Sequence, residues 1–210
     1  MSNAGHTNEQ CGHTNINCVN DLVQAIDKED CFHDQDVSHG ITYDLWGGHV
    51  RLWFRGHAEA TWNLEPLVYR AKLHDDEEHR ILKERHLAQD FENFGAALLT
   101  ECETDADIYF TMQHYRMPTR LLDWSGNPLA ALYFATANSD RDKQDGKIFA
   151  LDSYGFKGGH HTRRHPGLLK ALKSIFDWKD DSWPNGIMAV RPPMREARIV
   201  AQSSYFTFHP

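Results

Sequence analysis

The sequence lacks the long apolar stretches that mark membrane proteins. No hydrophobic run approaches the roughly 18 residues needed to cross a bilayer. The chain also opens without the basic and then apolar segments that make a secretory signal peptide. Its Ser2-Asn3-Ala4 is typical of the remnant of a cleaved tag. We therefore expect a cytoplasmic protein with no membrane partner.

Positive charge is also scarce. The 22 Lys and Arg residues are outnumbered by 30 Asp and Glu residues, which gives a net charge of −8 with histidine neutral. A protein that binds the phosphate backbone of nucleic acid needs a basic face, so this balance argues against general DNA binding. It leaves room for a local basic pocket that takes one small anion.

Cysteine is rare as well. The four cysteines, Cys11, Cys18, Cys31 and Cys102, have a spacing that fits no paired zinc knuckle. A metal site at Cys11, His13 and Cys18 is the weaker alternative. Free thiols in a reducing compartment are favoured, and we predict no metal cofactor.

What the sequence does contain is ordinary globular composition, with 40% hydrophobic and 25% charged residues in 210. That length is enough for one domain with a sizeable core. Residues 1–17, rich in Asn, Gly, Thr and His, are predicted to be a disordered tail, and residues 18–210 the domain. No internal repeat is present.

The hydrophobic periodicity predicts both helices and strands. Helices are expected over 19–26, 75–99, 105–115 and 168–176, with another opening at Asn127-Pro128; strands are expected over 50–55, 119–124, 147–151, 187–190 and 199–208. The long helix should bury Ile81, Leu82, Leu87, Phe91, Phe94 and Leu98. The apolar run 129–135 should also be buried. The fold class is therefore α+β, a single domain with a central mixed or split β-sheet flanked by helices.

The stretch from Gln113 to Ser125 is the most informative in the chain, because reactive polar side chains alternate there with apolar ones. Asp123, between Leu122 and Trp124, is expected to be buried, ionised and paired with a guanidinium. An ion pair between Arg120 and Asp123 that only fixes the strand is one interpretation. The other is that the segment forms a wall of a site, facing one cavity together with Arg55.

Other polar residues also have two interpretations. Arg55 pairs with a core carboxylate or binds a ligand. Gln113 satisfies backbone groups at a helix end or belongs to the site, and His114 is a hydrogen-bonded core histidine or a functional one. The loop 157–165, with Arg163-Arg164 among histidines, is solvated or binds an anion.

Several of these segments resemble the FRG domain family, named for its Phe-Arg-Gly triplet. The resemblance rests on Trp53-Phe54-Arg55-Gly56, Leu64-Glu65-Pro66-Leu67 with Arg70, Gln113-His114, Pro118 to Trp124, Asn127-Pro128, Ala131 to Ala135, and Arg198-Ile199 with Gln202 and Phe206. It covers roughly residues 18–208 and implies a bacterial or phage origin.

A more distant similarity is to the ADP-ribosyltransferases, and it implies a fold that binds NAD. The matching elements are Phe54-Arg55-Gly56, then Asp123-Trp124-Ser125 with the helix after it, then the strands at 146–152 and 198–206. A guanidinium would hold the pyrophosphate and an aromatic wall the ring. The position expected for the catalytic glutamate carries Gln202, and Asp123 is the substitute carboxylate.

Together these considerations define the candidate residues. The candidate catalytic residues are Arg55, Gln113, His114, Arg120 and Asp123. The candidate cofactor-binding residues are Arg55, Gly56, Arg70, Trp124, Ser125 and Gln202.

Three functions remain open. The first is an NAD-binding, ADP-ribosyltransferase-like enzyme in bacterial or phage defence or toxicity. The second is a non-catalytic recognition module for a nucleotide, a nucleic-acid end or a protein partner, which Gln202 favours because an amide cannot stabilise an oxocarbenium ion. The third is a hydrolase that uses His114 and Asp123 with Thr119 or Ser125 nearby.

Overall fold

The chain divides into two units, Met1–Gly40 and Ile41–Pro210. The computed structural model describes residues 14–28, 52–71, 76–137, 144–153, 161–162, 166–176, 186–192 and 204–210. Most of the predicted tail, together with Cys11, His13 and Cys31, lies outside these ranges. In the first unit, α1 (Val19–Lys28) confirms the predicted helix, and the Asp21 carboxylate accepts from the N–H groups of Asn17 and Cys18. Cys18 is exposed and its thiol is free.

The second unit is built on a mixed sheet of six strands. They are β1 (Leu52–His57), β2 (Leu121–Ser125), β3 (Lys147–Asp152), β4 (His161–Thr162), β5 (Met188–Arg191) and β6 (Ser204–Phe208). Their order is β3-β1-β2-β6-β5-β4, and all neighbours are antiparallel except β4 and β5, which are parallel. The α+β class and the mixed sheet are confirmed.

The sheet is joined weakly between β1 and β2. The full length of β1 pairs with β3, and the full length of β2 pairs with β6. Between β1 and β2, only Phe54 and Ser125 stand in register. The two halves of the sheet therefore separate beyond this pair, which positions the site described below.

The helices of this unit begin where the sequence offers caps. They are α2 (Leu67–Arg70), α3 (Glu77–Phe94), α4 (Asp105–His114), α5 (Pro128–Thr136) and α6 (Pro166–Phe176), with a 3₁₀ turn at Ala96–Leu98. Asp76 caps α3, Thr104 and Asp107 form a capping box on α4, and Asn127 caps α5 ahead of Pro128. Among the described residues, no helix is both long and apolar enough to cross a bilayer.

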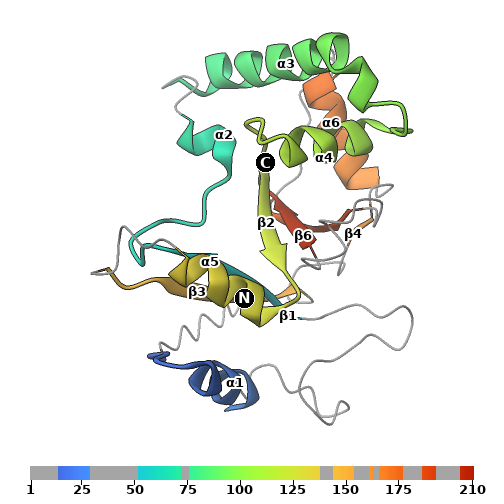
Figure 1. Cartoon of the computed structure of the whole chain (residues 1–210). Coiled ribbons are helices and arrows are strands. Elements are labelled where there is room, and N and C mark those ends of the chain that lie inside the picture. The colour runs from blue at the N-terminus through green and yellow to red at the C-terminus, as the bar shows by residue number, and fades with distance from the viewer. Residues whose placement is uncertain are drawn as a thin grey trace, which may run out of the picture. The chain divides into compact units, whose positions relative to one another are not determined.

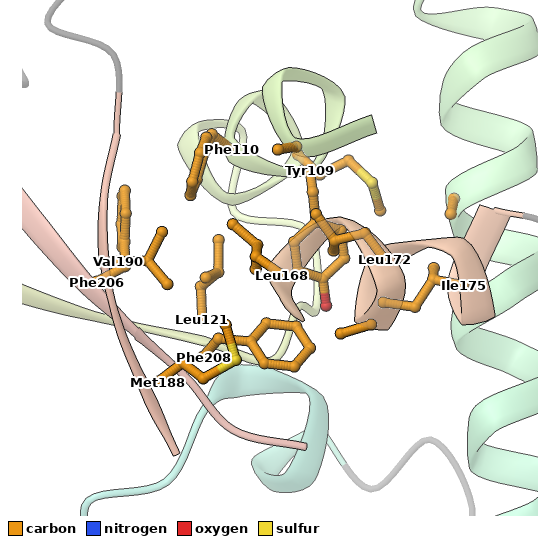
Figure 2. Packing of buried hydrophobic residues seen from close by; sticks show 14 of the residues in the cluster. Tyr109, Phe110, Leu121, Leu168, Leu172, Ile175, Met188, Val190, Phe206 and Phe208 are labelled. Carbon is orange, nitrogen blue, oxygen red and sulfur yellow. The ribbon is translucent and has the colours of Figure 1, made fainter. Parts of the chain in front are cut away.

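The main core lies where α4 and α6 pack against β2, β5 and β6. Figure 2 shows its centre, in which Tyr109 and Phe110 of α4 meet Leu168, Leu172 and Ile175 of α6 and the strand residues Leu121, Met188, Val190, Phe206 and Phe208. Phe110 stacks on Phe206 with ring centroids 5.4 Å apart. A second cluster is formed by Trp53, Leu122, Trp124, Ala189 and Tyr205. Alternate residues of β2 and β6 thus serve two clusters, as the strand period of two requires.

The predicted buried stripe of α3 is wrong in part. The helix buries Glu84, Ala88 and Phe91, whereas Phe94 is 87% exposed and Leu82 and Leu98 are also exposed. The reason is Glu84, whose carboxylate takes a place in the core by accepting from Arg120 and Tyr109. Residues 84, 88 and 91 then share one inward face at helical spacing, and Leu82 and Phe94 fall outside that face.

The prediction that residues 129–135 are buried as a block is also wrong. Helix α5 lies over β1 and β3 (Figure 1) and buries only Ala131 and Ala135. Leu129, Tyr133 and Phe134 are exposed. The cause is close approach to Gly56, where a Cβ would lie 1.8 Å from the Ala131 carbonyl oxygen. A helix that approaches a strand so closely packs its small side chains inward, so its large ones point away.

Candidate functional site

A cavity of about 750 Å³ lies where β1 and β2 separate. Its lining comes from β1 and the loop after it, from α2, from the end of α4, and from β2. Of the candidate residues, the lining includes Arg55, Gly56, Arg70, Gln113, His114, Asp123, Trp124 and Ser125. This volume suits a small organic ligand. Segments far apart in the sequence thus supply one concave surface.

Arg55 spans the gap between the two halves of the sheet. Its Nη1 donates to the backbone carbonyl oxygen of Asp123 at 2.8 Å, just beyond the point where the β1–β2 pairing stops. Its Nε donates to His57 Nε2 at 2.9 Å. Both acceptors are neutral, so neither cancels the charge of the guanidinium. Burial, followed by repulsion from Arg70, lowers the pKa of Arg55, while the Asp123 carboxylate raises it.

Two further basic side chains line the cavity. Arg70, at the end of α2, is exposed and donates from Nε to the Glu65 carbonyl oxygen at 2.9 Å. Arg116 also lines the cavity and has φ of 60°, a left-handed conformation that a non-glycine residue adopts at a cost of about 1 kcal/mol. In a chain of net charge −8, three guanidinium groups line one cavity, and this local positive charge can attract an anion.

The cavity lining also includes a carboxylate, that of Asp123, which is held by a chain of polar side chains. The buried Thr119 hydroxyl donates to Gln113 Oε1, which fixes the orientation of the amide. Gln113 Nε2 then donates to Asp123 Oδ2 at 2.8 Å. Thr119 Oγ1 also accepts from the N–H of Leu121 at 3.2 Å, so this chain of side chains is anchored to β2. A carboxylate positioned in this way can accept hydrogen bonds from ligand hydroxyl groups.

Arg120 does not belong to this cavity, contrary to the prediction. Its side chain is buried, and its Nε donates to Glu84 Oε2 at 2.8 Å. Nη1 donates to the Tyr69 hydroxyl at 2.9 Å, and the backbone N–H donates to the Tyr109 hydroxyl at 2.7 Å. Burial alone would lower the pKa of Arg120, but the Glu84 carboxylate and the two tyrosines raise it. Arg120 is a core residue that ties β2 to α2, α3 and α4.

The predicted burial of Asp123 and its pairing with Arg120 are therefore wrong. Asp123 is the one exposed residue of β2, between Leu122 and Trp124, which are both buried. Because successive side chains of a strand point to opposite faces, Asp123 points away from Leu122 and Trp124, and it lines the cavity. The guanidinium that acts on its charge is that of Arg55.

The aromatic wall differs from the predicted one. Trp124 lines the cavity, but its indole belongs to the second core cluster, and Nε1 donates to Thr207 Oγ1 at 2.9 Å. Ser125 is buried, and its Oγ accepts from the N–H of Asn127. The exposed aromatic rings in the lining are Trp62 and Phe134. These two rings, from the loop after β1 and from α5, are the surfaces on which a planar ligand can stack.

Three sequence predictions cannot be placed. Gln202, the segment 193–203 and most of the loop 157–165 lie outside the described residues. Among the residues that are described, no group of histidine, cysteine, aspartate or glutamate side chains is arranged to hold a metal ion.

The geometry can now be set beside known proteins. The sequence model of the FRG domain matches residues 50–144. The chain carries an FRG domain. The match runs from β1 through α5 and contains every lining residue of the cavity except Ser204 and Phe206 of β6. No curated protein and no solved structure matches the chain.

The triplet that names the FRG domain has a separate physical role at each position. Phe54 forms the one registered pair with β2, Arg55 bridges the gap beside that pair, and Gly56 allows α5 to contact the strand. One strand segment therefore connects the two halves of the sheet, places a positive charge at the cavity and allows α5 to pack closely.

Sequence reasoning gave His57 no role in the site and gave Thr119 only a minor one. His57 directly follows the triplet, and its alternation with Arg55 on β1 could have placed the two side chains together. Glu84 was missed because a carboxylate at that position of α3 is typical of a solvated helix surface. No local signal reveals that its partner lies 36 residues away.

Proposed function

We propose that the FRG domain binds an NAD-related adenine nucleotide in the cavity between β1 and β2. The single observation that carries this proposal is the placement of Arg55. Its guanidinium lies at the separation of the sheet, hydrogen-bonded only to neutral acceptors, beside the cavity. A charge held in this way favours a ligand phosphate, because no internal carboxylate takes the hydrogen bonds.

The rest of the lining supports a nucleotide over a simple anion. Arg70 and Arg116 add positive charge for a pyrophosphate, and Trp62 and Phe134 offer rings against which a base can stack. Asp123, positioned by Gln113, suits the hydroxyl groups of a ribose. Phosphate, ring and sugar each have a complementary group in one cavity.

Turnover is a separate step of the proposal. Cleaving the bond from nicotinamide to ribose gives the sugar oxocarbenium character, which a carboxylate stabilises. Asp123 is the candidate for that role, and His114 lies in the same lining. An enzyme of this kind would transfer ADP-ribose or hydrolyse NAD, and the bacterial or phage association of the family suggests defence or toxicity.

A recognition module is the second candidate, and one observation favours it. Asp123 is exposed and already accepts from Gln113, which is an arrangement suited to binding a hydroxyl group. The hydrolase alternative is weakened because the Thr119 hydroxyl is buried and donates to Gln113. The distinction between enzyme and module is therefore whether bound NAD is consumed.

Isothermal titration calorimetry with NAD, ADP-ribose and AMP tests the binding claim. We expect NAD and ADP-ribose to bind more tightly than AMP by at least about tenfold, because a second phosphate reaches a second guanidinium. The absence of heat with all three ligands, at a protein concentration of about 100 µM, would contradict nucleotide binding with a dissociation constant in the micromolar range.

Nicotinamide release tests turnover. Wild-type protein and Asp123→Asn are incubated with NAD for hours, and free nicotinamide is measured by chromatography. Release by the wild type and not by Asp123→Asn identifies an enzyme. Binding without release identifies the recognition module.

A further inference from the structure

His57 lies at the basic end of the cavity with both ring nitrogens engaged. The residue is buried, and its Nε2 accepts from Arg55 Nε at 2.9 Å. Its Nδ1 lies 3.3 Å from the carbonyl oxygen of Trp62. The ring also packs edge-on against Phe149, with centroids 5.0 Å apart. His57 therefore connects the loop after β1 to the guanidinium that faces the cavity.

These partners determine the tautomer of His57. The Nε of arginine always carries a proton, so His57 Nε2 must be an unprotonated acceptor. A carbonyl oxygen only accepts, so Nδ1 must carry the proton and donate it to Trp62. The imidazole is thus neutral with its proton on Nδ1.

A neutral acceptor has a particular effect on Arg55. The guanidinium has five N–H protons, of which one goes to His57 and one to the Asp123 carbonyl oxygen. Nη2 and the second proton of Nη1 remain for a ligand. A carboxylate in place of His57 would also orient the group, but it would cancel the charge that attracts an anion.

We propose that His57 is the positioning residue of the anion site, holding the Arg55 guanidinium toward the cavity without neutralising it. The neutral Nδ1–H tautomer fixes one edge of the guanidinium, and the Asp123 carbonyl oxygen fixes a second position. The proposal deepens the nucleotide-binding function and rests on it for the identity of the ligand. The hydrogen-bonded positioning of Arg55 itself can be measured in the free protein.

The charges around His57 keep the ring neutral. Burial first, and then Arg55 on the same strand, Arg70 of α2 and Lys147 of β3, lower its pKa, whereas the Trp62 carbonyl oxygen raises it. All three side chains that face His57 electrostatically are cations. The acids Glu65 and Asp123 and the imidazole of His114 also line the cavity, and the Asp123 carboxylate acts on Arg55 rather than on His57.

Two variants separate positioning from packing. His57→Gln keeps an acceptor that can reach Arg55 Nε, whereas His57→Phe keeps a ring against Trp62 and Phe149 but removes the acceptor. With ADP-ribose as the probe in calorimetry, we expect His57→Phe to weaken binding about tenfold and His57→Gln to stay within about threefold of wild type. Equal affinity losses in both variants would overturn the positioning role.

The pH profile gives a second readout. Because His57 is a neutral acceptor, ADP-ribose affinity should change in parallel in the wild type and in His57→Gln between pH 7.5 and 6. A wild-type affinity that rises about tenfold at pH 6 while His57→Gln stays flat would mean that protonated His57 contacts the ligand, and would overturn the proposal.

Nuclear magnetic resonance of the ligand-free protein keeps the test independent of ADP-ribose. The ¹⁵N shifts of His57 should report a proton on Nδ1, and the Nε–H of Arg55 should exchange slowly in the wild type and His57→Gln but faster in His57→Phe. A proton on Nε2, or equal exchange in all three proteins, refutes the positioning role. If these signatures appear but ADP-ribose does not bind, the proposed function fails while the geometry of Arg55 stands.

Discussion

The core and the cavity each contain a largely buried arginine, and the two arginines are held in different ways. Arg120 belongs to the core region and Arg55 to the cavity region. Arg120 is buried with its charge matched by Glu84, and its Nη1 donates to the Tyr69 hydroxyl. Arg55 has no such carboxylate bond; a histidine nitrogen and a backbone carbonyl oxygen hold it beside open space. The difference teaches that a guanidinium paired with an internal acid belongs to the core, whereas one held by neutral acceptors keeps N–H groups that are available to a ligand.

The largest expected effect concerns the core region. Glu84→Gln leaves the Arg120 charge buried without a carboxylate, so the free energy of unfolding should fall by about 3–5 kcal/mol. Urea denaturation measures it, and Glu92→Gln on the exposed side of the same helix is the control. A loss below about 1 kcal/mol would show that Arg120 is hydrated and would remove the contrast between the two arginines.

The next largest effect on stability concerns the packing of α5 against β1, beside the cavity. In Gly56→Ala the new Cβ meets the backbone oxygen of Ala131, which cannot move without shifting the helix. We expect a destabilisation of about 3 kcal/mol, at the upper end of overpacking costs, in thermal or urea unfolding. Ala131→Gly should not rescue the variant, because the clash involves backbone atoms. An unchanged urea midpoint would mean that α5 does not pack on β1 in this way.

A smaller effect tests the cavity region alone. Arg70→Gln should weaken ADP-ribose binding about tenfold, since a charge-assisted contact to phosphate is worth about 1.5–3 kcal/mol and this side chain is exposed. Arg85→Gln is the matched control, because Arg85 also donates from Nε to a backbone carbonyl oxygen but does not line the cavity. If both variants bind ADP-ribose as the wild type does, Arg70 makes no contact with the phosphate.

The smallest effect comes from Arg116, which separates stability from binding. Glycine adopts a φ of 60° without strain, so Arg116→Gly should raise the free energy of unfolding by about 0.5–1 kcal/mol. The same change removes a guanidinium from the cavity and should weaken ADP-ribose binding several-fold. Urea denaturation and calorimetry on one preparation measure both. A variant that is less stable would show that the Arg116 side chain has a structural role.

The fold could be predicted further than the site. Helices and strands followed from periodicity and caps, and the order of β1, β2 with α5, and β3 along the chain was correct. The inward faces of α3 and α5 could not be predicted, because Glu84 and Gly56 set them through partners distant in sequence. A pattern of apolar residues does not reveal which helix face a buried acid or a close backbone contact will select.

The sequence predicted correctly that a group of polar residues lines one cavity, but it assigned some members of the group to the wrong partners. Arg55, Gln113, His114 and Asp123 do line one cavity. An ion pair between Arg120 and Asp123, three residues apart, was one of the two interpretations of this segment, but Arg120 pairs with Glu84 and Asp123 accepts from Gln113. Spacing along an extended segment shows which residues are close, but not where each side chain points. The acid that pairs with Arg120, Glu84, lies on α3.

One titration tests the contrast between the two arginines most directly. In ¹⁵N-labelled protein, the Nε–H resonances of Arg55, Arg70, Arg85 and Arg120 are followed as ADP-ribose is added. The Arg55 and Arg70 resonances should move together to saturation, while those of Arg85 and Arg120 stay in place. Saturable movement of Arg120 without Arg55, or no movement of any of the four at millimolar ligand, would contradict the assignment of Arg55 to the ligand and Arg120 to the core.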